Sequence, residues 1–279
     1  MKKAVIVTNA NKDTDLSVTA RVAERLLKNG MIPYTAEQEL KAPEGIRHYT
    51  EFPTDADIIL VVGGDGSVID ASRYSVALGI PLLAVNLGKV GYLAEVEPDD
   101  LSPLDRLASG DYRVEKRMLL QVEKDGILST ALAVNDVVIS HEDYLGISSL
   151  RVADSLGNTI GYRADGVIIS TPQGSTAYSL SSGGPVIAHG VDGILLTPVC
   201  PHSFFNRSVI FSESEVLSVM NSGDSPLNIS IDGRRYSSLC QGESCRVFAS
   251  ESTFDMITLS ENSMFRNLFR KMRILEDID

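Results

Sequence analysis

The first third of the chain alternates short, continuous apolar runs with amphipathic segments. Ala4–Val7, Ile58–Val62 and Pro81–Val85 are apolar throughout, which is typical of parallel strands buried on both faces. Leu16–Lys28 and Ser67–Leu78 lie between these runs and are predicted to be helices, the first because its apolar residues recur at helical spacing. This alternation of strands and helices predicts an open parallel sheet.

Beyond about residue 110 the pattern changes to short apolar stretches joined by turn residues. Asp125-Gly126 and Gly157-Asn158 are such turns, and helical periodicity becomes sparse. The strands expected here are Met118–Val122, Ala131–Ser140, Leu150–Ala153, Gly166–Ser170 and several short segments from Val216 to Leu259. The second part of the chain is therefore predicted to be a β-rich, layered domain.

These patterns place the chain in the α/β plus β class, with two domains. Residues 1–108 are expected to form the open parallel-sheet α/β domain and residues 109–261 the β-rich domain, with the binding site in the cleft between them. The tail from Met264 to Leu275 is amphipathic, with basic residues among the apolar ones. It either contacts a membrane or partner, or packs back on the first domain as a helix over residues 262–279, which is the expected alternative.

Charge and composition narrow the possible partners. The 279 residues carry a formal net charge of −12, with 43% hydrophobic and 22% charged residues, so a globular protein is expected rather than a disordered one. An acidic chain lacks the basic surface that nucleic acid or anionic lipid requires. The apolar run after Met1-Lys2-Lys3 is too short for a secretory signal, and none reaches the ~20 residues of a membrane span. We therefore expect a cytoplasmic protein that binds neither nucleic acid nor membrane.

Cysteine and histidine residues are sparse and do not form a metal-binding pattern. Cys200, Cys240 and Cys245 are odd in number, and no histidine stands at a zinc-ligand spacing from the last two. We expect reduced cysteines that pack as small hydrophobic residues. The histidines are scattered and expected to be structural or exposed: His48, His141, His189 and His202.

A glycine-rich loop, Gly63-Gly64-Asp65-Gly66-Ser67, follows the second apolar strand and begins a helix. In open parallel sheets ligands bind at this edge, and the free N–H groups of a helix start suit phosphate. No Gly-Lys-Ser/Thr follows, so the loop is not a P-loop, and Ile69 stands where a dinucleotide fingerprint needs its third glycine. Asp65 would repel phosphate unless it faces a hydroxyl or a metal ion, which suits phosphoryl transfer to an alcohol. The alternative is an ordinary turn in which Asp65 or Ser67 caps the helix.

Two further segments carry polar residues where a ligand would satisfy them. Asn135 and Asp136 interrupt an apolar strand, and burying them unpaired would cost a few kcal/mol. Ribose hydroxyls and an adenine edge would satisfy both, as would a bulge with internal hydrogen bonds. The segment Asp165–Gly184 joins a strand to a loop dense in hydroxyls, which either holds a polar ligand or contains helix caps such as Ser175 and Thr176.

Taken in order, these motifs resemble those of the NAD kinase family. The resemblance covers about residues 58 to 235 and rests on the following segments: Gly63–Ser67, Asn86-Leu87-Gly88 leading to Gly91-Tyr92-Leu93, Asn135-Asp136, Thr171–Tyr178, Leu196–His202 and Ile231-Asp232-Gly233. It implies an α/β nucleotide-binding domain, a β-sandwich-like NAD-binding domain, an active site between them, and a homodimer or homotetramer.

The resemblance also implies a reaction and its residues. A phosphoryl group passes from ATP or polyphosphate to the 2′-hydroxyl of the adenosine ribose of NAD, giving NADP, with Mg²⁺ or another divalent cation as cofactor. Asp65 matches the catalytic aspartate, no side chain is assigned to the metal, and the donor loop is Gly63, Gly64, Gly66 and Ser67. The NAD-binding positions are Asp65, Gly66, Tyr92, Asn135, Asp136, Asp165, Thr176, Ala177, Tyr178, Ser181 and Cys200.

The chain departs from the family pattern at two positions. Asp136 replaces the more common Glu and is one methylene shorter, and Cys200 stands where a small residue such as Ala is common, so packing rather than chemistry is expected of its thiol. Two rival functions remain open at this point. One is a lipid or sugar-phosphate kinase with the same Gly-Gly-Asp-Gly loop, and the other is an NAD-binding sensor without catalysis.

Overall fold

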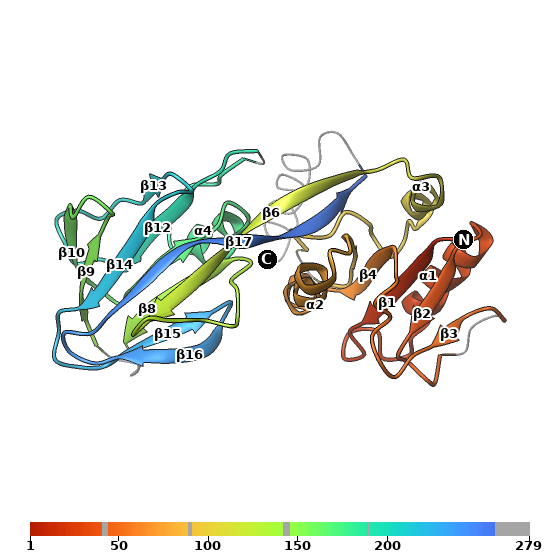
Figure 1. Ribbon diagram of the computed structural model, residues 1–279, viewed down its shortest axis with the longest axis horizontal. Coiled ribbons are helices and arrows are strands. Elements are labelled where there is room, and N and C mark those ends of the chain that lie inside the picture. The colour runs from red at the N-terminus through yellow and green to blue at the C-terminus, as the bar shows by residue number, and fades with distance from the viewer. Residues whose placement is uncertain (41–43, 89–90, 142–145, 189, 260–279) are drawn as a thin grey trace, which may run out of the picture. The chain divides into compact units, whose positions relative to one another are not determined.

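The structure, a computed structural model, describes residues 1–40, 44–88, 91–141, 146–188 and 190–259 (Figure 1). The chain divides into two units. Unit 1 comprises Met1–Lys116 and the chain from Phe254 onward, and unit 2 comprises Arg117–Thr253. The predicted helix over residues 262–279, including Met264–Leu275, lies outside the described residues, as does His189.

Unit 1 contains a parallel sheet in the order β5-β4-β1-β2-β3. Its strands are β1 (Lys3–Thr8), β2 (Ile32–Thr35), β3 (Arg47–His48), β4 (Ile58–Gly63) and β5 (Leu82–Asn86). Met256 of β17 (Ser244–Thr258) lies parallel to Leu82 at the free side of β5. The α/β sheet predicted from the apolar runs is confirmed, with β2 and β3 as additional short strands.

The helices of unit 1 are α1 (Ser17–Lys28), α2 (Asp65–Leu78), η1 (Ser102–Leu104) and α3 (Asp105–Ser109). Helix α1 buries Val22 and Leu26 in one core with Ile6 of β1 and Leu60 of β4. Helix α1 leads from β1 to β2, whereas α2 leads from β4 to β5 on the other side of β1. Right-handed crossovers therefore place α1 and α2 on opposite faces of the sheet, so the strand order reverses between β1 and β4. In open α/β sheets, ligands bind at the carboxyl ends of the strands on either side of such a reversal.

Unit 2 is a sandwich of antiparallel strands. One sheet has the order β13-β12-β11-β8-β15-β16, and the other contains β10, β9, β14 and β17, with β6 pairing β17 and β7. The strands are β6 (Arg113–Lys124), β7 (Ile127–Leu128), β8 (Asp136–His141), β9 (Ser148–Ala153), β10 (Thr159–Ala164), β11 (Gly166–Ser170), β12 (Ile194–Val199), β13 (Val209–Phe211), β14 (Val216–Asn221), β15 (Leu227–Ile231) and β16 (Arg234–Leu239). Both sheets contribute to one core, for example Ile139 and Ile169 from the first and Val152 and Val219 from the second. The predicted β-sandwich-like domain is thereby confirmed.

Alternate residues of the first sheet face away from this core. Val138, Ile168 and Val199 form a small buried apolar cluster on that outer face. The 3₁₀ turn η2 (Gln173–Thr176) and helix α4 (Tyr178–Ser181) follow β11, and the Ser179 hydroxyl lies 2.8 Å from the Thr197 hydroxyl of β12. The polar loop predicted between Asp165 and Gly184 therefore covers part of this outer face.

Several element boundaries differ from the sequence prediction. The division between units falls at residues 116/117 and 253/254, inside the long strands β6 and β17, whereas the sequence pattern suggested a division near residues 108/109 and 261/262. The last region contains this 15-residue strand and not only short ones. The strand predicted from Ala131 begins only at Asp136, since Ala133 pairs with Leu120 as an isolated bridge. No helix among the described residues is long and apolar enough to cross a membrane.

Candidate active site

The glycine-rich loop forms the junction of β4 and α2. Gly64 is the N-cap with extended backbone angles, φ −107° and ψ −173°, and Asp65 is the first helical residue. A Cβ on Gly63 would lie 2.6 Å from Cβ of Ser67, so close packing rather than a left-handed backbone requires glycine there. The backbone N–H of Leu87 donates to the Gly63 carbonyl at 2.7 Å, which ties this loop to the loop after β5.

Asp65 is oriented by the loop after β5 and does not cap its own helix. Its two carboxylate oxygens accept hydrogen bonds from the backbone N–H groups of Tyr92 at 3.1 Å and Leu93 at 2.9 Å. The structure thus disagrees with the alternative in which Asp65 is a helix cap. Two consecutive donors fix the plane of the carboxylate, while its remaining lone pairs stay available to a ligand. Burial, with the Asp65 charge as a second cause, raises the pKa of the neighbouring Tyr92.

The loop after β5 is itself held by the buried side chain of Asn86. Its Oδ1 accepts from the Gly88 N–H at 2.8 Å, and its Nδ2 donates to Glu97 Oε2 at 3.1 Å. Gly91 has φ +60°, and a Cβ there would overlap the Asn86 amide. The Asn-Leu-Gly and Gly-Tyr-Leu motifs therefore work together: Asn86 shapes the turn that presents the Tyr92 and Leu93 N–H groups to Asp65.

The Asn135-Asp136 corner in unit 2 is held on one side by Asp232. The carboxylate of Asp232 accepts three backbone N–H groups, from Val134 and Asn135 at 2.8 Å and from Asp136 at 3.1 Å. The Asp232 N–H in turn donates to the Asp136 carbonyl at 3.0 Å. Charge-assisted bonds of this kind are about twice as strong as neutral ones, so the corner is rigid.

Thr171 and Gly174 hold the same corner from the other side. The Thr171 N–H donates to the Asn135 carbonyl at 2.9 Å, and its hydroxyl donates to the Val134 carbonyl at 2.7 Å. A Cβ on Gly174 would overlap the Asn135 carbonyl. Residues of the Thr171–Tyr178 motif therefore shape the Asn135-Asp136 segment through contacts with its backbone. The backbone of this segment is satisfied by hydrogen bonds within the protein, as the alternative without a ligand expected.

Asp136 is buried, with 5% of its surface exposed. Burial, and secondarily the charge of Asp232, raises its pKa to about 7. Burial also raises the pKa of Asp232, although its three N–H donors oppose this shift. The side chain of Asp136 has no hydrogen-bond partner in the described part of the chain, so a buried carboxyl at this corner is open to a ligand that donates hydrogen bonds.

The hydroxyls of the η2 turn are largely used within the turn. Ser175 Oγ donates to the Pro172 carbonyl at 2.6 Å and accepts from the Ile187 N–H, and Thr176 Oγ1 donates to the Gln173 carbonyl at 3.1 Å. Neither hydroxyl caps a helix as the alternative reading expected, because both donate to carbonyls three residues earlier, and Ser175 is fully buried. Beyond the turn, Ala177 is half-buried, whereas Tyr178 and Ser181 are exposed.

Cys200 lies beside Asp165 rather than in the core. It has a left-handed backbone, φ +45°, and a hydrogen bond to Asp165 raises the pKa of its thiol. Its exposure corrects the expectation that all three cysteines are packed: Cys200 and Cys240 are exposed, and only Cys245 is buried. Tyr178 lies near this pair, because Cys200, Asp165 and Asp136 all contribute to raising its pKa after burial.

The predicted site residues thus form one group in each unit. In unit 1 the structure brings together Gly63, Gly64, Asp65 and Tyr92, and in unit 2 it brings Asn135, Asp136, Asp165, Tyr178 and Cys200 near one another. The role of Asp232 escaped the sequence prediction. An aspartate followed by glycine after an apolar strand was the available signal, and its left-handed φ of +46° marks the turn.

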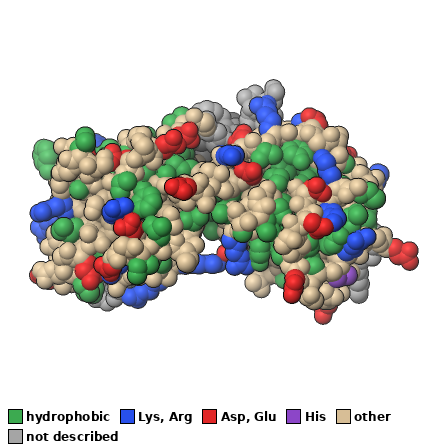
Figure 2. Space-filling model, in the orientation of Figure 1, with side chains coloured by type: hydrophobic (Ala, Val, Ile, Leu, Met, Phe, Trp, Pro, Cys, Tyr) green, Lys and Arg blue, Asp and Glu red, His purple; other side chains and the backbone are tan. Residues whose placement is uncertain are grey.

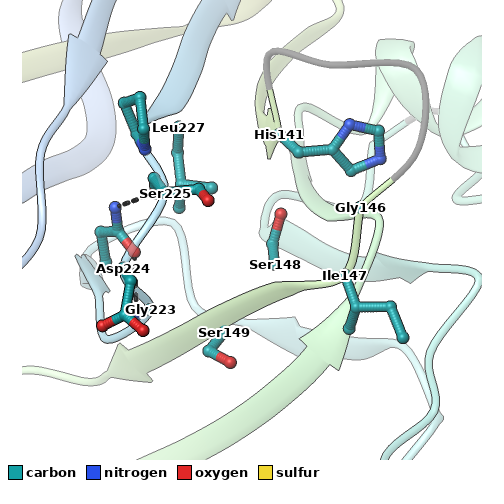
Figure 3. Close-up of a pocket in the computed structure, with 11 residues that line it drawn as sticks. His141, Gly146, Ile147, Ser148, Ser149, Gly223, Asp224, Ser225 and Leu227 are labelled. Atoms are coloured by element: carbon teal, nitrogen blue, oxygen red, sulfur yellow. Dashed lines mark hydrogen bonds between the residues drawn. The ribbon is translucent and has the colours of Figure 1, made fainter.

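A cavity of about 340 Å³ lies elsewhere in unit 2 (Figure 3). Its lining includes His141, Ser148, Asn221 and Asp224. His141 ends β8, whereas Asp136 begins it, so the cavity lies about 17 Å along the strand from the corner. The cavity contains none of the predicted site residues.

The described residues offer no cluster of three or more His, Cys, Asp or Glu side chains able to hold a metal ion. Lys and Arg side chains are scattered among acidic and uncharged ones on the face shown in Figure 2.

Comparisons with known proteins assign both parts of the chain. Residues 4–112 match the ATP-NAD kinase N-terminal domain and residues 102–259 the ATP-NAD kinase C-terminal domain. An NAD kinase of Thermoanaerobacter sp. (strain X514) is 34% identical over 280 residues, covering 98% of this chain and 99% of the relative. An NAD kinase of Caldanaerobacter subterraneus subsp. tengcongensis is 35% identical, covering 97% and 98%.

Solved structures have the same fold. A yeast NADH kinase complexed with NADH superposes with a TM-score of 0.84 at 21% identity, covering 100% of this chain and 89% of that one. An NAD kinase from Archaeoglobus fulgidus in complex with ATP gives a TM-score of 0.74 at 23% identity, covering 98% and 99%.

Proposed function

The chain belongs to the NAD kinase family and phosphorylates NAD to NADP, and from this premise we propose how its residues divide the reaction. Asp65 is the catalytic group, and the observation that carries this assignment is its carboxylate, fixed by two backbone N–H groups at the start of α2. The family assignment also identifies the acceptor as NAD rather than a lipid or a sugar phosphate.

The chemical step transfers the terminal phosphoryl group of the donor to the 2′-hydroxyl of the adenosine ribose. A bond forms between the 2′-oxygen and the γ-phosphorus, the bond from that phosphorus to the β,γ-bridging oxygen breaks, and ADP leaves. The proton of the hydroxyl passes to the Asp65 carboxylate. Because the transition state of such transfers is loose, positioning carries most of the rate.

ATP is the donor we propose, since the matching family models name ATP and the Archaeoglobus fulgidus enzyme binds it. Gly63, Gly64, Gly66 and Ser67 form its phosphate loop, with the free N–H groups at the start of α2 directed to phosphate oxygens. Rates with ATP and with polyphosphate, each with NAD and NADH as acceptors, test this choice. Faster NADP formation from polyphosphate than from ATP would contradict it.

A divalent cation, Mg²⁺ in our proposal, neutralises phosphate charge when bound. The described residues fit such an ion if it enters with the donor, because they offer no cluster of three or more His, Cys, Asp or Glu side chains, while Asp65 begins α2 in the proposed phosphate loop. Asp65 keeps lone pairs free of the Tyr92 and Leu93 N–H groups and would hold it.

The NAD-binding residues in our proposal are those that match the motifs of the family. In unit 1, Asp65, Gly66 and Tyr92 serve the reacting ribose. In unit 2, Asn135 pairs with the adenine edge and Asp136 accepts from ribose hydroxyls, because the corner leaves the buried Asp136 carboxyl without a partner among the described residues. The remaining contacts to the dinucleotide come from Asp165, Thr176, Ala177, Tyr178, Ser181 and Cys200.

NAD affinity should depend on pH through Asp136. Free enzyme holds this carboxyl with a pKa near 7, whereas ribose hydroxyls donate best to the ionised form, so affinity should rise from pH 6 to pH 8. Calorimetric titration of NAD across this range measures it. An Asp136→Asn variant supplies the control, and an equal pH dependence in that variant would exclude Asp136 as the cause.

Stability of the free enzyme should change in the opposite direction. A carboxyl whose pKa is raised from 3.8 to about 7 by folding stabilises the fold fully below pH 3.8, and this contribution is lost as pH rises through 7. Relative to Asp136→Asn, the free energy of unfolding should therefore fall by up to about 1.4 kcal/mol per pH unit in this window. Urea unfolding of both proteins between pH 5 and 8 provides the measurement.

The substitution Gly66→Ala should raise stability while it weakens substrate binding. A Cβ there would meet no atom within 4 Å, and Gly66 lies in the first turn of α2 with no left-handed backbone. Gly66→Ala should therefore raise stability by up to about 1 kcal/mol through helix propensity, yet raise the KM for NAD or ATP because the open space receives substrate. Thermal unfolding and steady-state kinetics measure the two effects. Unchanged kinetics would remove Gly66 from the substrate contacts.

We further propose a cytoplasmic homodimer or homotetramer. The three free cysteines suit a reducing compartment, and Phe204 and Phe205 are exposed, with 108% and 43% of their surface accessible, as is typical of residues covered in an oligomer. Sedimentation velocity measures the oligomeric state, and a monomer at micromolar concentration would contradict it.

A further inference from the structure

The loop between β1 and α1 is fixed against the glycine-rich loop. The Asn9 side-chain amide donates to Ser67 Oγ at 2.9 Å, and the Asn9 N–H donates to the Val62 carbonyl at 2.9 Å. The Asn9 carbonyl accepts from the N–H groups of Lys12 and Asp13, which makes the segment a tight turn. This turn holds the backbone of Lys12 beside the start of α2.

Asp13 holds the same turn from the other end. Its buried carboxylate accepts from the backbone N–H and the hydroxyl of Thr19, at 2.8 and 2.6 Å, and from the Val18 N–H. Asp13 thereby satisfies the free N–H groups in the first turn of α1. The Asp13 carboxylate thus binds the N-terminal turn of α1 and does not form an ion pair with Lys12.

The ammonium of Lys12 lies against two glycines of the proposed phosphate site. A Cβ on Gly64 would overlap Lys12 Nζ, and a Cβ on Gly88 would lie 3.6 Å from it. The two glycines are close to each other as well, since a Cβ on either would lie 3.5 Å from the Cα of the other. Loops from the carboxyl ends of β1, β4 and β5 therefore meet at this ammonium, at the edge of the sheet where the strand order reverses.

The charges around this point favour an anion. Lys12 is exposed and makes no ion pair or hydrogen bond with its side chain in the described part of the chain. The positive end of α2 lies beside it, and the nearest carboxylate of the helix, Asp65, is directed to the N–H groups of Tyr92 and Leu93. A cation at a helix N-terminus is unfavourable unless a negative group joins it, because both charges are positive.

We propose that Lys12 binds the terminal phosphates of the ATP donor and is a catalytic residue of the reaction. This inference rests on the proposed function, which places the donor in the glycine-rich loop. As a point charge with three donors, Lys12 contacts the γ-phosphoryl oxygens and the oxygen on which charge develops as ADP leaves. Gly64 is small because the Lys12 side chain occupies the space of a Cβ.

The test is the substitution Lys12→Met, which keeps a flexible, unbranched apolar side chain and removes the ammonium group with its charge. We expect kcat/KM for ATP to fall by about 30-fold, which is typical for the loss of a hydrogen bond to a charged group. The KM for NAD should stay within about twofold of the wild-type value. ATP affinity measured by calorimetry without NAD should fall by a similar factor. Lys12→Arg should recover part of the loss, since it restores charge with different geometry.

Two controls distinguish a phosphate contact from a structural role. Lys28, exposed at the end of α1, is the matched lysine, and Lys28→Met should leave both constants unchanged. The unfolding temperature of Lys12→Met should equal that of the wild type, because the side chain is exposed. Gly64→Ala should also cost less in the Lys12→Met background than in the wild type, since its Cβ then displaces no ammonium.

The assignment of Lys12 would be overturned if Lys12→Met kept its kcat/KM and its affinity for ATP within twofold of the wild type. It would also be overturned if the variant lost as much for NAD as for ATP. Failure of the proposed function has a different result. Wild-type enzyme that forms no NADP from ATP contradicts the donor, whereas the calorimetric comparison of ATP binding to wild type and Lys12→Met still decides the role of Lys12.

Discussion

Replacing Asp65 by Asn should lower kcat for NADP formation by about 10³-fold or more while the Kd for NAD changes only a few-fold. Asn has the same shape and still accepts one hydrogen bond from the Leu93 or Tyr92 N–H, so the loop geometry is largely retained. It has no carboxylate to take the proton of the 2′-hydroxyl, and general base catalysis contributes about 10²- to 10⁴-fold. Steady-state kinetics with saturating ATP and NAD, together with calorimetric NAD binding, measure both quantities.

Asp70 supplies the matched control for this substitution. It lies on the same helix, α2, is exposed, and also carries a carboxylate. Asp70→Asn should leave kcat within about twofold of the wild type. Retention of more than a tenth of wild-type kcat by Asp65→Asn would remove Asp65 from the proton transfer and reduce it to a residue that shapes the loop.

Replacing Gly174 by Ala should disrupt the Asn135-Asp136 corner. The new Cβ would overlap the Asn135 carbonyl, a backbone atom that is held by Thr171 and, through its own N–H, by Asp232. Relief requires movement of backbone, so a cost of about 3 kcal/mol or more is expected, equivalent to an unfolding temperature lower by roughly 10 °C. The Kd for NAD should rise at least tenfold, because Asn135 and Asp136, which we propose contact the nucleoside, move together.

Gly161 in β10 is the matched glycine of the same unit. A Cβ there would meet no atom within 4 Å, and its backbone is not left-handed, so Gly161→Ala should change neither stability nor NAD affinity appreciably. Differential scanning fluorimetry and calorimetric titration of both variants provide the comparison. Normal NAD binding by Gly174→Ala would contradict the proposed role of the corner.

The fold could be predicted where burial leaves a periodic signal in the sequence. Ile58–Val62 is buried on both faces of the sheet and is apolar at every position, so its strand was evident. Strand β3, Arg47–His48, is exposed and only two residues long, and no pattern of hydrophobic residues marks it. The start of β8 is predicted too early for a related reason, since Ala131–Val134 is apolar at every position although Ala133 belongs to a separate bridge.

The site could be predicted at residues whose chemistry is visible in the side chain. Asp65 in a glycine-rich loop and Asn135-Asp136 in an apolar segment are conspicuous because charge is costly there. Asp232 was not identified as a functional residue, because its contribution lies in three bonds to backbone N–H groups 96 to 98 residues earlier in the chain. Such long-range backbone contacts leave no periodicity. The same holds for Lys12, whose position depends on how three loops meet.

The two groups of site residues share one design. In each group, a carboxylate accepts hydrogen bonds from consecutive backbone N–H groups: Asp65 in unit 1 and Asp232 in unit 2. Each group also contains a glycine, Gly91 or Gly174, at a position where a Cβ would overlap a neighbouring residue. Backbone groups cannot rotate away as side chains do, so the proposed substrate-binding groups are positioned before any ligand arrives.

The central claim is catalysis, and the most direct test is NADP formation by the wild-type chain from NAD, ATP and Mg²⁺. The product is measured with an NADP-specific dehydrogenase, and NAD binding is measured calorimetrically on the same sample. We predict turnover that requires both ATP and Mg²⁺ and yields product phosphorylated at the 2′-position. Folded enzyme that binds NAD but forms no NADP with any donor would contradict the account and identify the chain as an NAD-binding sensor.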